Sequence, residues 1–322
     1  MDGAAFSGLV ERHRHELRVH CYRMTGSFTD AEDLVQETML RAWKGRDGLA
    51  DAGALRPWLY RIATNVCLDA LASPARTREL ALTVDTSGGS ARSASAEVTW
   101  LEPFPDRLLD AAEQGPEAVA IARETIELAF LAAIQHLPVR QRAVLILRDV
   151  LGWPAAEAAE ALEMSVASLK SALQRARETM RRTLPPDRSA WGAGDGIGEE
   201  ERAVLRRYIA ASQSADVTAL ASLLRHDARQ TMPPANLMFD GREAIIAMWR
   251  EALVGEGAWG QWRTVEVAVN RQPAMASYVR RDGESTFTAV NIDVLRIEDG
   301  LITEIITFGP ELLPFFGLER SL

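Results

Sequence analysis

The spacing of apolar residues divides the chain into stretches of different character. From residue 4 to about 72, and again from 117 to about 184, apolar residues recur every three or four positions, which predicts α-helices. From 199 to 322, helix-like runs are followed by alternating apolar runs that predict strands. The pattern therefore predicts two all-α domains, 1–72 and 117–186, followed by an α+β domain.

The run DAEDLVQETMLRAW, Asp30 to Trp43, predicts a helix with one unusual residue. We expect Thr29 to cap it, with Glu32 reaching back to the cap. One face carries an ordinary core stripe, formed by Ala31, Leu34, Val35, Thr38, Met39 and Ala42. Leu40 projects from the opposite face, in a polar frame made by Asp33, Gln36, Glu37 and Lys44. An exposed leucine among acids indicates a surface that contacts another molecule.

The run LRPWLYRIATNVCLDAL, which starts at Leu55, predicts a second helix of interest. Its core face holds Leu59, Ile62, Ala63, Val66 and Ala70. A stripe beside that face holds Trp58, Arg61, Asn65 and Asp69. An aromatic ring, a cation and an amide along one line suit unstacked nucleic-acid bases. The alternative is that Trp58 packs and the polar residues cap or bridge neighbouring helices.

The segment 137–182 predicts a helix-turn-helix. A helix through Val150 is expected to stop at Gly152. Pro154 suits the first turn of a short helix that ends near Leu162, and Ser165 can cap a long one. On the long helix the predicted buried side is Val166, Leu169, Leu173, Ala176 and Met180, and the predicted outward side is Ser168, Ser171, Gln174 and Arg175, flanked by Lys170 and Arg177.

Charge makes this long helix a candidate for nucleic-acid binding. Residues 165–182 hold five Lys or Arg and one Glu, although the whole chain of 322 residues has a net charge of -9. Bulk electrostatics therefore argues against a protein that coats nucleic acid, and leaves the local basic helix as the candidate. Such a helix can contact phosphates and base edges of duplex DNA. The alternative is a solvated basic face on a structural helix.

The remaining composition is that of a soluble globular protein, 47% hydrophobic and 25% charged. The two cysteines, Cys21 and Cys67, are expected to be reduced thiols. The N-terminal run has charges where a signal peptide needs apolar residues, and no later run reaches the length of a membrane span. We therefore expect a cytoplasmic protein with no membrane partner.

Two stretches without steady periodicity are predicted to be linkers. Residues 73–116 are rich in Ser, Ala, Gly and Pro, and residues 187–198 in Pro, Gly and Asp. Within the first, Trp100, Phe104, Leu108 and Leu109 are apolar and stand among acidic residues. This composition is unusual for a passive tether and predicts a short docking segment.

The last 124 residues are expected to contain helices first and strands afterwards. Two helices are predicted over 199–225 and a third over 241–253. Strands are predicted over 262–270, 273–281, 291–297 and 301–308, the last two joined by a hairpin turn at Glu298-Asp299-Gly300.

Taken in order, the Asp30 helix, the Trp58 helix and the helix-turn-helix resemble the two structured regions of an extracytoplasmic-function (ECF) sigma factor of the sigma-70 family. The resemblance covers about 1–72 and 117–184. It implies that the chain directs core RNA polymerase to specific promoters in transcription initiation, with the polymerase β′ clamp helices and β flap and the promoter −10 and −35 elements as partners.

The resemblance also implies roles for individual residues. The polymerase-facing patch would be Asp33, Gln36, Glu37 and Leu40. The residues that help melt and hold the −10 element would be Trp58, Arg61, Asn65 and Asp69. The residues that read the −35 element would be Ser168, Lys170, Ser171, Gln174, Arg175 and Arg177. The chain departs from the family pattern after Asp69, where only Arg76 and Arg78 supply positive charge, and at Ala172, where an arginine often stands.

Residues 199–322 resemble the SnoaL-like group of the nuclear transport factor 2-like superfamily. This implies a cone of helices and a curved sheet, with an apolar pocket and a regulatory role in place of a separate anti-sigma protein. The aromatic residues available to line a pocket that holds a small-molecule ligand are Phe239, Trp249, Trp259, Trp262, Tyr278 and Phe287. The alternative is that these aromatic residues are ordinary core. The His226-Asp227 pair is expected to lie in a loop and is a weak signal of catalysis, and we expect no enzyme activity.

Two other functions stay open on the sequence alone. A stand-alone helix-turn-helix regulator would keep the basic helix but would have no use for the Leu40 patch. A SnoaL-type small-molecule enzyme would carry the helical regions as an appendage. The sequence contains no metal cluster, phosphate-binding loop, nucleotide fingerprint or nucleophilic triad, so no cofactor is implied.

Overall fold

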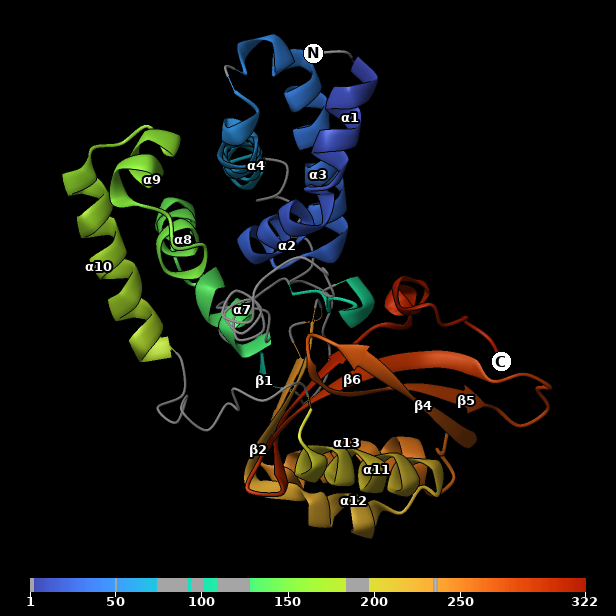
Figure 1. Ribbon diagram of the computed structural model, residues 1–322. Coiled ribbons are helices and arrows are strands. Elements are labelled where there is room, and N and C mark those ends of the chain that lie inside the picture. Colours follow the sequence, from blue (N-terminus) through green and yellow to red (C-terminus); the bar gives the residue numbers. More distant parts are fainter. Residues whose placement is uncertain are drawn as a thin grey trace. The chain divides into compact units, whose positions relative to one another are not determined.

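The chain folds into two compact units (Figure 1). The computed structural model describes residues 3–49, 51–73, 92–93, 101–108, 128–183, 197–233, 235 and 237–322. The first unit comprises 1–81, 100–102 and 108–188, and the second comprises 82–99, 103–107 and 189–322. Helical domains followed by an α+β domain with a mixed sheet confirm the predicted fold class. Most of the two predicted linkers, with Trp100, Leu109, Arg76 and Arg78, lies outside the described residues.

The N-terminal part of the first unit is a helical bundle. Its helices are α1 Gly3–Glu11, α2 Arg14–Thr25, α3 Phe28–Gly45 and α4 Leu55–Leu71, with 3₁₀ turns at Arg46–Gly48 and Ala52–Ala54. Helices α2, α3 and α4 pack against one another. Fully buried Leu17, Val35 and Leu59 come from these three helices in turn, and both cysteines are buried free thiols. The amphipathic patterns therefore meet in one core.

Helix α3 begins earlier than the sequence predicted. Ser27 has extended backbone, and its hydroxyl accepts a hydrogen bond from Asp30 N at 3.0 Å, so Ser27 is the cap. The predicted cap at Thr29 is wrong because that residue already lies in the first turn. Glu32 pairs with Arg18 of α2 instead of reaching back along its own helix.

The second part of the first unit contains the helix-turn-helix. It comprises α7 Leu128–Gln135, α8 Val139–Leu145, a π-helical turn η4 Ile146–Val150, α9 Ala155–Ala161 and α10 Val166–Thr183. Pro154 is the N-cap of α9, just outside the helix in which it was predicted. Val166 was predicted to be buried, but it is 39% exposed because it is the first residue of α10. Ala172 is buried in its place on the core face.

The second unit is built on a mixed sheet in the strand order β1-β3-β2-β7-β6-β5-β4. The strands are β1 Arg92–Ser93, β2 Leu224–Met232, β3 Leu237–Asp240, β4 Gln261–Val269, β5 Gln272–Arg280, β6 Thr288–Glu298 and β7 Leu301–Phe308. Strands β2 and β7 run parallel, and the other pairs are antiparallel. Asp299 and Gly300 both have positive φ between β6 and β7, as the predicted two-residue turn requires.

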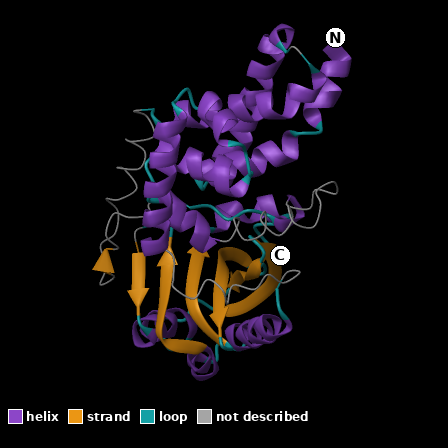
Figure 2. Ribbon diagram, turned by 60° about the vertical axis from the view of Figure 1, so that its left-hand side comes forward, coloured by secondary structure: helices purple, strands orange, loops and turns teal. Residues whose placement is uncertain are grey.

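Three helices cover one face of this sheet (Figures 1 and 2). They are α11 Glu199–Gln213, α12 Val217–Leu223 and α13 Arg242–Leu253, and a 3₁₀ helix η6, Pro310–Phe316, follows β7. Tyr208, Ile245 and Leu295 belong to the core between helices and sheet. Strands β2 and β3 were not predicted, and β2 begins at Leu224, where the sequence suggested continued helix. Among the described residues, every helix is too short or too polar to span a membrane.

A buried histidine in the first unit makes stability depend on pH. His20 of α2 is completely buried, with Nε2 3.0 Å from Thr64 Oγ1. The Thr64 hydroxyl donates to Tyr60 O at 2.7 Å, so it must accept its second hydrogen bond from His20 Nε2–H. Burial, with a smaller contribution from the charge of Arg23, lowers the pKa of His20 to about 3.

We predict that acidification destabilises the protein through His20. The pKa of a histidine in an unfolded chain is about 6.5, so as the pH falls below that value the unfolded state binds a proton that the folded state refuses. The free energy of unfolding should then fall by up to about 1.4 kcal/mol per pH unit. Urea unfolding between about pH 7 and about pH 5 measures this slope. His20→Asn should flatten the slope, whereas His226→Asn, at an exposed site, should not; parallel slopes for all three proteins would contradict the prediction.

Candidate functional site

Helix α3 presents an apolar pair to solvent. Leu40 is 54% exposed, as its position opposite the core stripe predicted, and Trp43 one turn later is 40% exposed. The Trp43 ring rests on Phe6, with 6.1 Å between centroids, and the Arg46 guanidinium lies 4.5 Å from its centroid. The sequence analysis did not include Trp43 in the exposed patch. Its position three residues after Leu40 could have indicated it, because residues three apart lie on the same side of a helix.

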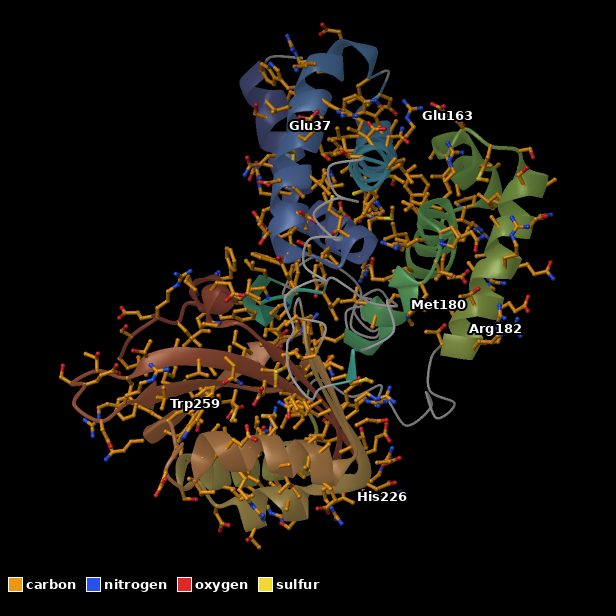
Figure 3. The ribbon with its side chains drawn as sticks, turned by 180° about the vertical axis from the view of Figure 1, so that it is seen from behind. Glu37, Glu163, Met180, Arg182, His226 and Trp259 are labelled. Atoms are coloured by element: carbon orange, nitrogen blue, oxygen red, sulfur yellow. The ribbon has the colours of Figure 1, made fainter. Side chains whose placement is uncertain are left out.

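An arginine joins the acids of α3 to α4. Arg41 Nε donates to Glu37 Oε1 at 2.7 Å, and Arg41 Nη1 donates to Asp69 Oδ2 at 2.9 Å. Glu37 belongs to the predicted polymerase patch (Figure 3), and Asp69 to the predicted −10 stripe. Asp33 and Gln36 are exposed beside them. The two surfaces predicted separately from the sequence are therefore linked by one exposed ion-pair network.

The stripe on α4 is partly packed and partly open. Trp58 is half-buried, with its ring edge-on to Phe6 at 6.4 Å, so one side of the ring packs as the alternative interpretation expected. Arg61 and Asp69 are exposed, and Asn65 is half-buried. This arrangement leaves a line of polar groups beside an aromatic ring. The −10 role of the four residues stays a prediction.

Helix α10 presents the outward face that the sequence indicated. Ser168, Lys170, Ser171, Gln174, Arg175 and Arg177 are all exposed. Ser165 accepts from Ser168 N at 3.1 Å, which makes it the predicted cap. Arg177 is held by two hydrogen bonds to Asp149, of 2.8 and 2.7 Å. Buried Leu169, Leu173, Ala176 and Met180 fix the opposite side of the helix.

The corner between α2 and α3 receives charged groups from distant parts of the first unit. Arg142 of α8 donates from Nη1 to Met24 O at 2.5 Å. The Glu102 carboxylate accepts from Ser27 Oγ at 3.0 Å and from Thr29 N at 2.8 Å. Elsewhere in the unit, the rings of Tyr60 on α4 and Trp153 before α9 meet edge-on at 6.0 Å. The two helical parts are therefore in contact within this unit.

Residues 103–107, which follow Glu102, belong to the second unit. Phe104 is fully buried there, its N–H donates to Asn270 Oδ1 at 2.7 Å, and its carbonyl accepts from Asn270 N at 3.0 Å. Asp106 accepts from Arg271 N at 2.8 Å. Residues 101–108, which include the predicted Phe104 and Leu108, make up the described part of the predicted docking segment.

The second unit contains a cavity of about 360 Å³. Trp249, Trp259 and Trp262 line it, whereas Phe239, Tyr278 and Phe287, which were also predicted, do not. Polar residues missed by the sequence analysis line it as well: Tyr208, Gln230, Asn291, Asp293 and Thr307. Asn291 and Asp293 are two residues apart on β6 and therefore face the same side of the sheet. Two polar residues at this spacing in an otherwise apolar strand could have indicated a polar wall.

Asp293 is the ionisable centre of the cavity wall. It accepts from Tyr208 Oη at 3.0 Å, Thr307 Oγ1 at 2.7 Å and Asn291 Nδ2 at 2.7 Å. Burial raises the pKa of Asp293, and these three hydrogen bonds oppose that effect. Burial and the neighbouring carboxylate likewise raise the pKa of Tyr208.

The His226-Asp227 pair lies outside this cavity. It is on strand β2 and not in a loop as predicted, and the His226 side chain is 84% exposed. Figure 3 shows His226 and Trp259 in separate parts of the domain. Asp227 is paired with Arg225. Over the described residues, His, Cys, Asp and Glu form no group of three that could hold a metal ion.

Comparisons with known families and proteins agree on the type of protein. Residues 9–77 match Sigma-70 region 2, residues 127–180 match Sigma-70, region 4, and residues 205–305 match a SnoaL-like domain. The ECF RNA polymerase sigma factor SigG of Mycobacterium tuberculosis (strain H37Rv) is 41% identical, over 98% of this chain and 85% of SigG.

More distant relatives give the same answer. ECF RNA polymerase sigma factor SigJ of the same strain is 34% identical over 67% of this chain and 61% of SigJ. The crystal structure of M. tuberculosis SigJ has a TM-score of 0.62 and 22% identity, and covers 99% of this chain and 100% of that one, which shows a shared fold. The identity to SigG over nearly the whole chain is decisive, and the chain belongs to the ECF family of RNA polymerase sigma factors.

Proposed function

We propose that this protein directs RNA polymerase core enzyme to promoters through three surfaces of its first unit. Leu40, with Asp33, Gln36 and Glu37, docks on the β′ clamp helices. The α4 stripe of Trp58, Arg61, Asn65 and Asp69 holds bases of the −10 element. The outward face of α10 reads the −35 element, and the β flap receives the domain that carries it. The observation that carries this proposal is the family membership together with an exposed Leu40 and an exposed basic helix.

We further propose that the described arrangement is a closed state. Helix α8 packs against both α10 and α4, which places the two DNA-binding helices about 20 Å apart at about 8–10 Å per helix contact. Elements centred 10 and 35 positions upstream are about 25 base pairs apart, or about 85 Å along duplex DNA. One unit of this size cannot reach both, so promoter binding requires the Arg142 and Trp153 contacts to separate.

The C-terminal domain would set the population of the open state. This proposal is supported by the segment 101–107. Within the first unit the segment forms hydrogen bonds through Glu102, and within the second unit it forms them through Phe104 and Asp106. When the open state is rare, a shift of about 1.4 kcal/mol changes its population tenfold. A small-molecule ligand of the C-terminal domain is one agent that could supply this shift.

The polymerase patch is tested by the double variant Leu40→Asp with Gln36→Ala. Core-enzyme binding should be lost while the circular dichroism spectrum stays unchanged, because an exposed apolar anchor concentrates binding energy and its replacement does not disturb the core. Val254→Asp, at an exposed apolar residue of the second unit, is the matched control and should bind normally. Equal core affinity for the double variant and the control would remove the docking assignment.

The recognition helix is tested by Arg175→Ala. If Arg175 makes a bidentate base contact, the change should cost about 1 to 3 kcal/mol of promoter affinity and relax preference at one −35 position. The measurement is holoenzyme binding to a set of promoters that differ at single −35 positions. Arg182→Ala, on the exposed end of the same helix, should weaken all of them together. A uniform loss with Arg175→Ala would assign that residue to phosphate instead.

The regulatory role is tested by truncation after Asp187. We expect the truncated chain to bind core enzyme more readily, because the closed state loses a restraint, yet to give less transcription per bound complex. Glu102→Gln should also bind core enzyme more readily, because it weakens the hydrogen bonds of the segment to Ser27 and Thr29. It should not lower transcription per bound complex, because the C-terminal domain stays in place. If truncation alters neither core binding nor promoter-dependent transcription, the C-terminal domain has no such role.

A further inference from the structure

One cation of the long basic helix α10 is already held by another element of the first unit. Arg177 donates from Nε to Asp149 Oδ2 at 2.8 Å and from Nη2 to Asp149 Oδ1 at 2.7 Å. The two residues are 28 positions apart in the sequence. Among the described residues, no acid forms an ion pair with Lys170 or Arg175 of the same helix. The contact with Asp149 therefore distinguishes Arg177 from the other cations of the outward face.

Asp149 is presented by the π-helical turn η4. In this turn Leu151 N donates to Ile146 O at 2.9 Å, five residues earlier, where an α-helix would bond four residues back. Ile146 and Leu147 face the core and are buried, whereas Asp149 is exposed beside α10. Single π-helical turns occur frequently at functional sites. The backbone of this turn thus places the carboxylate at the surface of α10.

The two hydrogen bonds occupy one edge of the Arg177 guanidinium. An arginine has five N–H donors in a flat fork, and Asp149 uses the Nε–H and one N–H of Nη2. The remaining donors belong to Nη1 and Nη2, and two of them form a parallel pair at the tip of the side chain. The Arg177 side chain is still 55% exposed. A pair of this kind can bind a guanine edge or a phosphate in bidentate fashion, so Asp149 fixes the direction of Arg177 without preventing it from binding.

The same contact changes the charge of the α10 surface. Lys170, Gln174, Arg177 and Arg181 line a shallow hollow along the helix. The carboxylate of Asp149 offsets one of the three positive charges in this row. Affinity for the phosphates of any sequence rises with the number of cations that neutralise them. An arginine that is paired with an acid therefore adds little to sequence-independent binding, while its directed donors can still select a base.

We propose that Asp149 is a positioning residue for −35 recognition, which aims the tip of Arg177 at the DNA and suppresses its attraction to phosphates of any sequence. The inference rests on the proposal that the outward face of α10 reads the −35 element, and it assigns part of the sequence preference to a residue outside that face. The alternative is that the pair only fastens η4 to α10. An exposed ion pair contributes little to stability, which argues against that alternative.

Removing the charge of Asp149 should tighten binding to DNA of any sequence. The measurement is fluorescence anisotropy of a labelled duplex of mixed sequence with the full-length protein, over about 50 to 200 mM salt. Asp149→Asn should bind about three- to tenfold more tightly at the lowest salt, and log affinity should fall with log salt more steeply by about 0.9, the slope of one added phosphate contact. Asp149→Glu keeps a carboxylate and should keep the wild-type slope. Unchanged, weaker or undetectable binding by Asp149→Asn would overturn the proposal.

Two controls separate the contact with Arg177 from the bare charge of Asp149. Glu160→Gln removes an exposed acid of α9 and should leave affinity and slope unchanged. In a protein that already carries Arg177→Gln, the further change Asp149→Asn should have no effect on either. If Asp149→Asn acts equally in both backgrounds, Asp149 repels DNA by itself and the proposal fails. A pair that only fastens the two elements would lower the unfolding temperature without tightening DNA binding.

The sequence preference of the holoenzyme tests the aim of Arg177. Holoenzymes made with each protein would bind a promoter library that is randomised over the −35 element, and the bound fraction would be sequenced. Arg177→Gln and Asp149→Asn should both relax the preference at the same position, because one removes the donors and the other releases their direction. If Arg177→Gln relaxes a position at which Asp149→Asn keeps the full preference, Asp149 does not aim the arginine.

Lys170→Gln distinguishes a failure of this inference from a failure of the −35 assignment. If α10 contacts DNA, the change should weaken binding to the mixed-sequence duplex and reduce the salt slope by about 1. An effect of Lys170→Gln without any effect of Asp149→Asn would overturn the role of Asp149 alone. If neither change has an effect, α10 is not a DNA-binding surface and both proposals fall.

Discussion

The arrangement of the first unit depends on side chains that bond backbone groups at the corner between α2 and α3. The end of α2 leaves carbonyls without helical partners, and the start of α3 leaves N–H groups. Arg142 supplies a cation to Met24 O, and Glu102 supplies an anion to Thr29 N, which matches the polarity of each helix end. Gly26 makes the turn at a φ of 73°, where an added Cβ would lie 2.9 Å from the Gln135 amide. The positive φ therefore favours glycine at this corner.

This corner brings together parts of the chain that are distant in sequence. Arg142 lies 118 residues from its acceptor, and Glu102 lies 73 residues from Thr29. A buried polar group that loses its partner costs about 1 to 3 kcal/mol, so a handful of such contacts holds the two sigma regions together with an energy that a protein partner can match. Contacts of this strength fit the proposed closed state, which must hold in the free protein and still open on binding.

The sequence predicted the parts of the fold that follow from periodicity. The helices of both sigma regions, α10 with its Ser165 cap and strands β4 to β7 have long or regular patterns, and they were found. Val166 and the Ser27 cap were missed because burial and capping at a helix end depend on where the first turn starts, which shifts by one or two residues without changing the pattern. Strand β2 was missed because its burial comes from pairing with β7, a long-range contact that leaves no local signal.

The polar wall of the cavity was the hardest feature to predict, and it is physically the most informative. A curved sheet closes most simply with apolar side chains, since burying a carboxylate costs stability that its hydrogen bonds only partly return. Here Asp293 is buried with Tyr208, Asn291 and Thr307 all directed at it. Their combined effect is to hold Thr307, whose hydroxyl oxygen in turn accepts from Gln230 Nε2 at 2.9 Å, so the polar wall is a connected hydrogen-bond network and not a set of isolated polar groups.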